Sequence, residues 1–174
     1  MAKEDKRAWA GVPIIILVGA ALALAGSQGS VEAGGIPVYA LGIGIAFGIQ
    51  WLVFIPSFIN KTEHFFDLTG SVTYTTVIIV ALLLSPKPDA RALMLGGMVI
   101  IWAVRLGTFL FKRVRKAGAD NRFDEIKVSF PRFLMTWTLQ GLWVSFSLAA
   151  ALAAITSEVR VPFDTFAAAG LLVW

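Results

Sequence analysis

Apolar residues occupy five long runs along the chain, separated by short polar segments. Four windows contain no Asp, Glu, Lys or Arg: residues 8–31, 33–60, 68–86 and 133–157. A fifth run, residues 92–111, contains one charge, Arg105. Because about 20 apolar residues span the hydrocarbon core of a bilayer, each run is long enough for a transmembrane helix.

This pattern predicts an all-α fold, a polytopic transmembrane helix bundle of five spans plus a partial sixth. Only helices and closed barrels satisfy their backbone polar groups in lipid, and these runs are too long for barrel strands. We place the spans near residues 10–27, 37–59, 69–85, 92–112 and 133–156.

The last apolar stretch, "VPFDTFAAAGLLVW", begins after Arg160 and differs from the others in length. From Phe166 to Trp174 it forms about 14 Å of helix, against a bilayer core of about 30 Å. We favour an incomplete span over a re-entrant or interfacial end. Residues 1–174 are therefore expected to be a single membrane domain, the N-terminal part of a longer protein.

Composition supports a membrane protein and argues against several other classes. The chain is 57% hydrophobic and 15% charged, whereas soluble domains carry about 25% charged residues. The absence of cysteine and the single histidine exclude disulfides, thiolate catalysis and a cysteine- or histidine-rich metal site. The net charge of +4 is concentrated in loops, without the aromatic–basic interleaving of single-strand binders, so no nucleic-acid partner is expected.

Loop charges predict the orientation. With the N-terminus inside, the inner segments hold 11 basic residues and the outer loops hold three, Lys87, Arg91 and Arg160. Cytoplasmic loops carry the excess of Lys and Arg, so we expect the N-terminus, residues 60–68 and residues 112–132 to be cytoplasmic, in a bacterial inner membrane. The basic start and long apolar run indicate a retained first span rather than a signal peptide.

Small residues recur at four-residue spacing in two predicted spans: Gly44 and Gly48, and Ala21 and Ala25. This spacing lets helix backbones approach closely. We favour packing within the bundle over a specific dimer.

The segment "NKTEHFFDLTGSVTY", residues 60–74, joins two spans and holds several polar side chains. Asp67 is interpreted as the N-cap of the third span, with Thr69 or Ser71 as alternatives, or else as an acid, base or substrate anchor. His64, next to Glu63, is interpreted as a solvated loop residue, with a proton shuttle as the less favoured alternative. Tyr74 is interpreted either as an interfacial anchor or as a proton donor to a carbonyl. The second interpretation follows if the helix starts early, because Asp67, Gly70, Ser71 and Tyr74 then share one polar face.

Arg105 has two interpretations of equal weight. An arginine within a span is functional by default, because it costs about 2.5–3.5 kcal/mol to insert. It also lies about 10 Å from the predicted cytoplasmic edge, so its long side chain could reach the interface.

The stretch "FKRVRKAGADNRFDEIKVSFPR", residues 111–132, is rich in basic residues. It is explained either by anchoring to anionic lipid or by a phosphate site built from arginine forks. The alternating signs of Asp120, Arg122, Asp124 and Glu125 predict an ordered, ion-paired turn. In the fifth predicted span, Gln140 beside Trp137 and Trp143 is either a helix-to-helix hydrogen bond or a pocket contact.

Three segments together resemble a known family: "FFDLTGSVTY", "WAVRLGTFLFKRVRKAGADNRFDEIK" and "PRFLMTWTLQGLWV". They are similar to polytopic membrane proteins of unknown function that are grouped with steroid 5-alpha-reductases. The resemblance implies an NADPH-dependent enzyme that reduces an activated C=C bond in a lipid-like substrate drawn from the membrane. It assigns these roles: catalytic, Asp67 and Tyr74; cofactor-binding, Arg105, Arg113, Asp120 and Arg122; substrate pocket, Gln140 and Trp143.

Much of the cofactor site of the wider family lies nearer the C-terminus, in an Arg-His-Asn-Tyr-Glu stretch that these residues lack. We therefore expect the assigned residues to form the N-terminal half of a site. Two alternatives stay open: a related membrane methyltransferase, and a non-catalytic membrane scaffold or transporter element.

Overall fold

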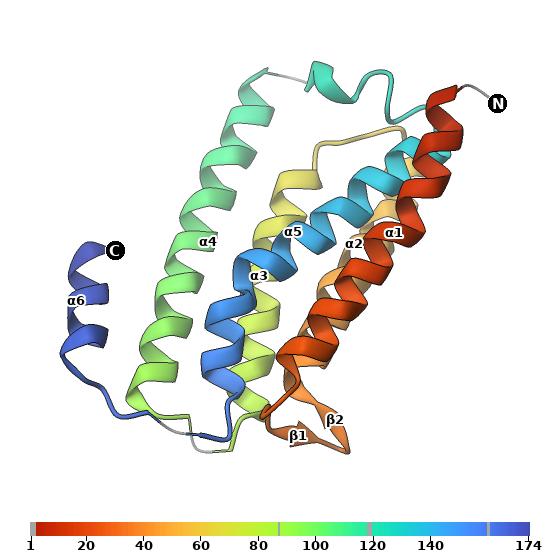
Figure 1. Cartoon of the computed structure of the whole chain (residues 1–174). Helices are drawn as coiled ribbons and strands as arrows, with labels where there is room; N and C mark the ends of the chain where they lie inside the picture. Colours follow the sequence, from red (N-terminus) through yellow and green to blue (C-terminus); the bar gives the residue numbers. More distant parts are fainter. Residues whose placement is uncertain (1–2, 87, 118–119, 160) are drawn as a thin grey trace.

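The computed structural model describes residues 3–86, 88–117, 120–159 and 161–174, and 78% of these described residues are helical. The described part contains six α-helices, one short 3-10 helix and a two-stranded hairpin (Figure 1). The helices are α1 (Lys3–Gly26), α2 (Val38–Ile59), α3 (Phe66–Leu84), α4 (Ala90–Ala117), α5 (Phe130–Thr156) and α6 (Thr165–Val173); the short elements are β1 (Glu32–Ala33), β2 (Ile36–Pro37) and η1 (Asn121–Phe123).

Five of these helices, α1 to α5, are long and apolar enough to cross a membrane. Their outer surfaces expose large apolar side chains, including Leu17, Leu24 and Leu83. Such a continuous apolar surface is incompatible with water around a monomer, and it suits contact with lipid tails. The predicted all-α bundle of five spans is confirmed, and the chain is an integral, multi-pass membrane protein.

The helices begin and end a few residues away from the predicted limits. The first span begins at Lys3, because the polar N-terminal residues continue the same helix. The fourth continues to Ala117, into the basic segment. The partial sixth element is the nine-residue α6, none of whose residues is buried. Of the loop residues used to predict orientation, Lys87 and Arg160 lie outside the described residues.

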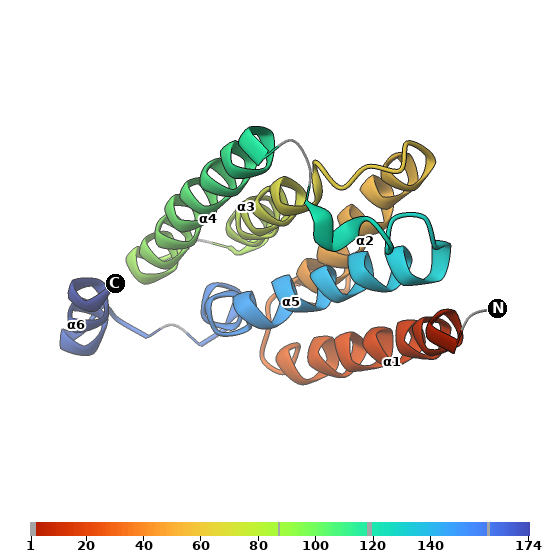
Figure 2. The same ribbon diagram turned by 90° about the horizontal axis from the view of Figure 1, so that it is seen from above.

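Helix α5 is the centre of the bundle. It packs against α1, α2, α3 and α4, and Figure 2 shows it between α1 on one side and α2 and α3 on the other. Glycines allow neighbouring helices to approach closely: a Cβ at Gly42 of α2 would lie 2.9 Å from Leu152 of α5, and one at Gly19 of α1 would lie 2.7 Å from the ring of Phe47 of α2. The prediction of close packing at Gly44 and Gly48 is wrong, because a Cβ at either would meet nothing within 4 Å.

The two ends of the bundle are closed differently. At one end, Gly34 and Gly35 make the turn of the β1–β2 hairpin with φ values of 60° and 79°, which is the left-handed backbone that a two-residue hairpin turn requires. At the opposite end, at the top of Figure 1, the α4–α5 connection folds onto the helix ends. There Phe123 of η1 packs between Phe66 and Phe133, with ring centroids 5.0 and 6.3 Å away.

Candidate functional site

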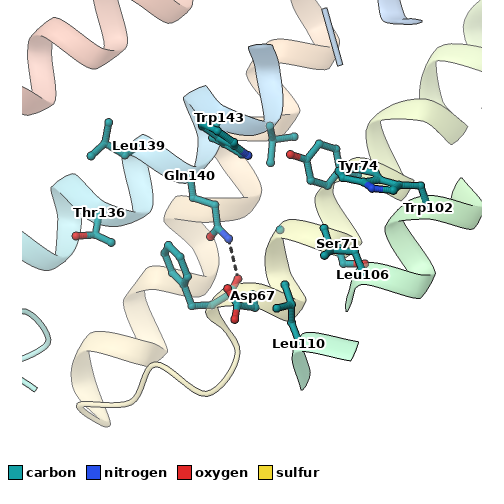
Figure 3. Close-up of a pocket in the computed structure, with 13 residues that line it drawn as sticks. Asp67, Ser71, Tyr74, Trp102, Leu106, Leu110, Thr136, Leu139, Gln140 and Trp143 are labelled. Carbon is teal, nitrogen blue, oxygen red and sulfur yellow. Dashed lines mark hydrogen bonds between the residues drawn. The ribbon is translucent and has the colours of Figure 1, made fainter. Parts of the chain in front are cut away.

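A cavity of about 620 Å³ opens between α3, α4 and α5, near the end of the bundle that η1 covers (Figure 3). Most of its lining is apolar, with a few polar groups from α3 and α5. Its lining residues are Phe66, Asp67, Gly70, Ser71, Tyr74, Trp102, Leu106, Leu110, Thr136, Leu139, Gln140, Trp143 and Val144. An apolar cavity with a small number of convergent polar groups is the usual form of a small-molecule site.

Helix α3 supplies the polar wall. Asp67, Gly70, Ser71 and Tyr74 follow at three- and four-residue spacing, so they lie on one face, as the sequence predicts, and all four line the cavity. The glycine at position 70 leaves room for Gln140, because a Cβ there would lie 2.7 Å from Nε2 of Gln140. Ser71 is directed to the neighbouring helix, where its hydroxyl donates to the carbonyl of Ala103 at 2.5 Å.

Tyr74 is the most deeply buried polar group of this wall, with 4% of its surface exposed. Its ring stands edge-on to Trp102 of α4, with centroids 4.9 Å apart. Its hydroxyl points toward α5, where Ser147 lies nearby, and it has no hydrogen-bond partner among the described residues (Figure 3). A buried hydroxyl without a partner costs free energy, so this phenol is available to a bound molecule.

Gln140 faces α3 from the opposite wall. Its Nε2 donates to the carbonyl of Phe66 at 2.9 Å, which joins α5 to the first turn of α3. Its Oε1 is buried and has no partner in the described part of the chain. Trp143, one turn further along α5, is 72% exposed and forms the rim of the cavity. The structure thus brings the two predicted catalytic residues and the two predicted pocket residues to one cavity.

Asp67 lies at the end of the cavity nearest η1, 3.6 Å from Arg113 of α4. Its interpretation as a helix cap is wrong. Helix α3 begins at Phe66, its N-cap residue is Phe65, and no side chain caps it. The two alternatives are also excluded, because Thr69 donates back to the carbonyl of Phe65 and Ser71 donates to α4. The Asp67 carboxylate therefore lines the cavity and pairs with Arg113 instead of capping the helix.

Arg122 and Asp120 form a bidentate pair beside η1, in which both Nε and a terminal nitrogen of the guanidinium donate to the carboxylate. These hydrogen bonds hold the pKa of Asp120 below its ordinary value and raise the pKa of Arg122. The predicted ion-paired turn is confirmed: Asp124 pairs with Lys127 at 3.0 Å, and Glu125 pairs with Arg132 at 3.8 Å.

Glu63 organises this loop, and sequence reasoning missed it. Its side chain is 2% exposed, its Oε2 accepts from Lys127 Nζ at 2.9 Å, and its Oε1 accepts from the backbone N–H of Asp120 at 3.1 Å. Burial alone would raise the pKa of Glu63, but the hydrogen bonds from Lys127 and Asp120 outweigh it and lower the pKa. Glu63 stands beside the more conspicuous His64, and its partner is 64 residues away in sequence, so no local pattern could identify the pair.

Arg105 does not join the other predicted cofactor residues. It lies on the exposed side of α4 and does not line the cavity. Arg113 and Arg122 do lie together near Asp67 and Asp120, but each guanidinium pairs with one of these carboxylates. The four-residue cluster is formally neutral. A phosphate could therefore bind these two arginines only in place of their carboxylate partners.

Comparison with known protein families identifies a match over most of the chain. Residues 53–174 match the model of a family described as "Protein of unknown function (DUF1295)". No curated protein and no solved structure matches the chain. The matched residues include every part of the cavity, from Phe66 to Val144.

Proposed function

From the premise that this membrane-spanning chain belongs to the DUF1295 family, we propose that it acts as a reductase-like membrane enzyme on a lipid-like substrate bound in the α3–α4–α5 cavity. The reaction is reduction of an activated C=C bond in a sterol-like or other lipid. The observation that carries the proposal is the unpaired, buried hydroxyl of Tyr74 in a mostly apolar cavity within the membrane-spanning region.

Tyr74 is the proposed acid. A C=C bond conjugated to a carbonyl becomes more electrophilic when a donor binds the carbonyl oxygen, and a phenol can supply that hydrogen bond and then the proton. Asp67, at the far end of the cavity, is the second group that could polarise or protonate the substrate, provided that it is protonated and released from Arg113. The apolar lining lowers the local dielectric constant, which strengthens any hydrogen bond made inside.

NADPH is the hydride donor that the resemblance implies. Arg113 and Arg122 have the chemistry to bind its phosphates only if they exchange their carboxylate partners for phosphate oxygens. The resemblance to steroid 5-alpha-reductases, together with the position of Arg113 beside Asp67 at one end of the cavity, supports this part of the proposal.

The substrate part is tested by equilibrium binding of a radiolabelled α,β-unsaturated keto-steroid to the purified chain in detergent. Tyr74→Phe removes only the hydroxyl, and we expect it to weaken binding roughly ten-fold, the effect of losing one buried hydrogen bond of about 1–1.5 kcal/mol. Tyr39→Phe is the matched control, because Tyr39 is the other tyrosine, is equally buried and lies outside the cavity. Equal losses in the two variants would contradict the role of Tyr74.

The cofactor part is tested by NADPH binding and by NADPH oxidation with the same steroid. We expect Arg113→Ala combined with Arg122→Ala to abolish NADPH binding, whereas Arg115→Ala combined with Lys116→Ala, an exposed pair of equal charge, retains it. Binding that survives the first pair of substitutions argues against the assignment. Methyl transfer from tritiated S-adenosylmethionine, without NADPH oxidation, would replace the reductase by the related membrane methyltransferase.

A further inference from the structure

A second cavity of about 450 Å³, which we call the groove, runs along the other side of the α3–α4 contact. Ser71 lines both cavities, and a Cβ at Gly107 would lie 2.3 Å from its hydroxyl, so this close contact separates them. The groove is lined by Leu68, Ser71, Val72, Thr75, Thr76, Val104, Gly107, Thr108, Phe111 and Lys112.

The walls of this groove suit an acyl chain. Val72 and Val104 are about half exposed on the outside of two membrane-spanning helices, so hydrocarbon surrounds them. The Thr75 hydroxyl donates to the carbonyl of Ser71 at 3.1 Å, so its hydrogen-bonding need is met within its own helix. A groove with these walls, in contact with lipid, is filled by an apolar chain at little desolvation cost.

Two basic side chains, those of Arg105 and Lys112, lie on the same face of α4. Lys112 lines one end of the groove, and Arg105 lies seven residues earlier, which is about two helical turns and about 10 Å along the axis. Both side chains are exposed, and neither takes part in a salt bridge of the described residues. A guanidinium within a span is costly unless it reaches an anionic or hydrated group.

We propose that this face of α3 and α4 binds an anionic phospholipid. Arg105 and Lys112 hold the headgroup phosphate, and one acyl chain lies in the groove toward Val104 and Thr75. The two positive charges indicate an anionic rather than a neutral lipid, because basic pockets between transmembrane helices bind anionic headgroups. The proposal gives Arg105 a role outside the substrate cavity and does not depend on the reductase function.

Native mass spectrometry of the purified chain, titrated in detergent with phosphatidylglycerol or phosphatidylcholine, tests this site. The wild type should bind its first phosphatidylglycerol more tightly than phosphatidylcholine. Arg105→Gln and Lys112→Gln together should remove this preference, at roughly five-fold in affinity for each cation. Thr108→Phe should fill the groove and weaken phosphatidylglycerol binding while both cations remain. Circular dichroism of each variant verifies that the helices are intact.

The matched control is Arg115→Gln with Lys116→Gln, which removes the same charge from exposed positions of α4 away from the groove. It should retain most of the preference. The proposal is overturned if the wild type shows no preference for phosphatidylglycerol over phosphatidylcholine. It is likewise overturned if the control variant loses as much of this preference as the Arg105 and Lys112 variant does. It is also overturned if the wild type is a dimer that Thr108→Phe dissociates, because a second copy would then occupy the groove.

Discussion

At the residue scale, most of the electrostatic structure lies in a small number of pairs that join distant parts of the chain. Asp67 of α3 meets Arg113 of α4, and Glu63 meets Lys127 and the backbone of Asp120. Among these carboxylates, Glu63 combines two separate partners with almost no solvent contact. It therefore ties the α4–α5 connection to the entrance of α3, close to the site.

The Glu63–Lys127 pair predicts a defined pH range of stability. The pKa of Glu63 is below its ordinary 4.5, so the contribution of the carboxylate is full above that value and is lost as the pH falls through the lowered pKa. The pKa of Lys127 is above its ordinary 10.5, mainly because of its hydrogen bond to Glu63, so its contribution is lost only as the pH rises through that higher value.

We expect Glu63→Gln to cost about 1.5–3 kcal/mol near neutral pH, as for a hydrogen bond between charged groups. The measurement is thermal unfolding in detergent as a function of pH, for wild type and variant. The difference between the two should shrink as the pH falls below about 4.5. Asp124→Asn, at the exposed partner of the same lysine, should change stability much less. A difference that does not change between neutral and acidic pH would contradict the assigned pairing.

At the element scale, polar contacts between spans set the register of α2 and α3. Gln50 of α2 is fully buried and donates from Nε2 to the Thr73 hydroxyl at 2.9 Å, while its Oε1 has no partner among the described residues. The pair therefore combines one hydrogen bond with one unsatisfied acceptor. Such bonds contribute on average about 0.6 kcal/mol between membrane helices.

This combination predicts an asymmetry between two substitutions. Gln50→Met removes the bond together with the unsatisfied acceptor, so we expect the unfolding temperature in detergent to be nearly unchanged. Thr73→Val leaves the buried amide of Gln50 without a partner, at a cost of about 1–3 kcal/mol, so the unfolding temperature should fall. If Gln50→Met destabilises as much as Thr73→Val, the bond itself is strongly stabilising and the expected asymmetry is wrong.

At the scale of the whole molecule, the alternating helices place η1 and the N-terminus at one end and the β1–β2 hairpin at the other (Figure 1). The chain has no cysteine, so a single introduced cysteine can be labelled without background from native thiols and shows on which side of the membrane its position lies. If the basic end is cytoplasmic, Gln28→Cys should react with a membrane-impermeant maleimide in intact bacterial cells, whereas Glu125→Cys should react only after lysis. Both positions lie in loops, at opposite ends of the bundle. The reverse labelling pattern would invert the topology.

Local pattern was enough to predict the helices and one wall of the site. A run of about 20 apolar residues has no alternative to a helix in lipid, so the five spans follow from composition along the chain. The 3.6-residue period likewise places Asp67, Gly70, Ser71 and Tyr74 on one face before any contact is known. The α4 wall, Trp102, Leu106 and Leu110, was not predicted, because an apolar residue in an apolar helix carries no sign of whether it faces lipid or a cavity.

What the sequence by itself determined is therefore the class of protein, the number of spans and the polar face of α3. Only the tertiary structure decided that Gln140 and Trp143 meet this face, that Arg105 stands outside the cavity, and that Asp67 pairs with Arg113 instead of capping its helix. The physical reason is that a transmembrane helix makes its backbone hydrogen bonds within its own segment, so local sequence is enough to form it. The rotation of each helix about its axis depends instead on the neighbours it packs against.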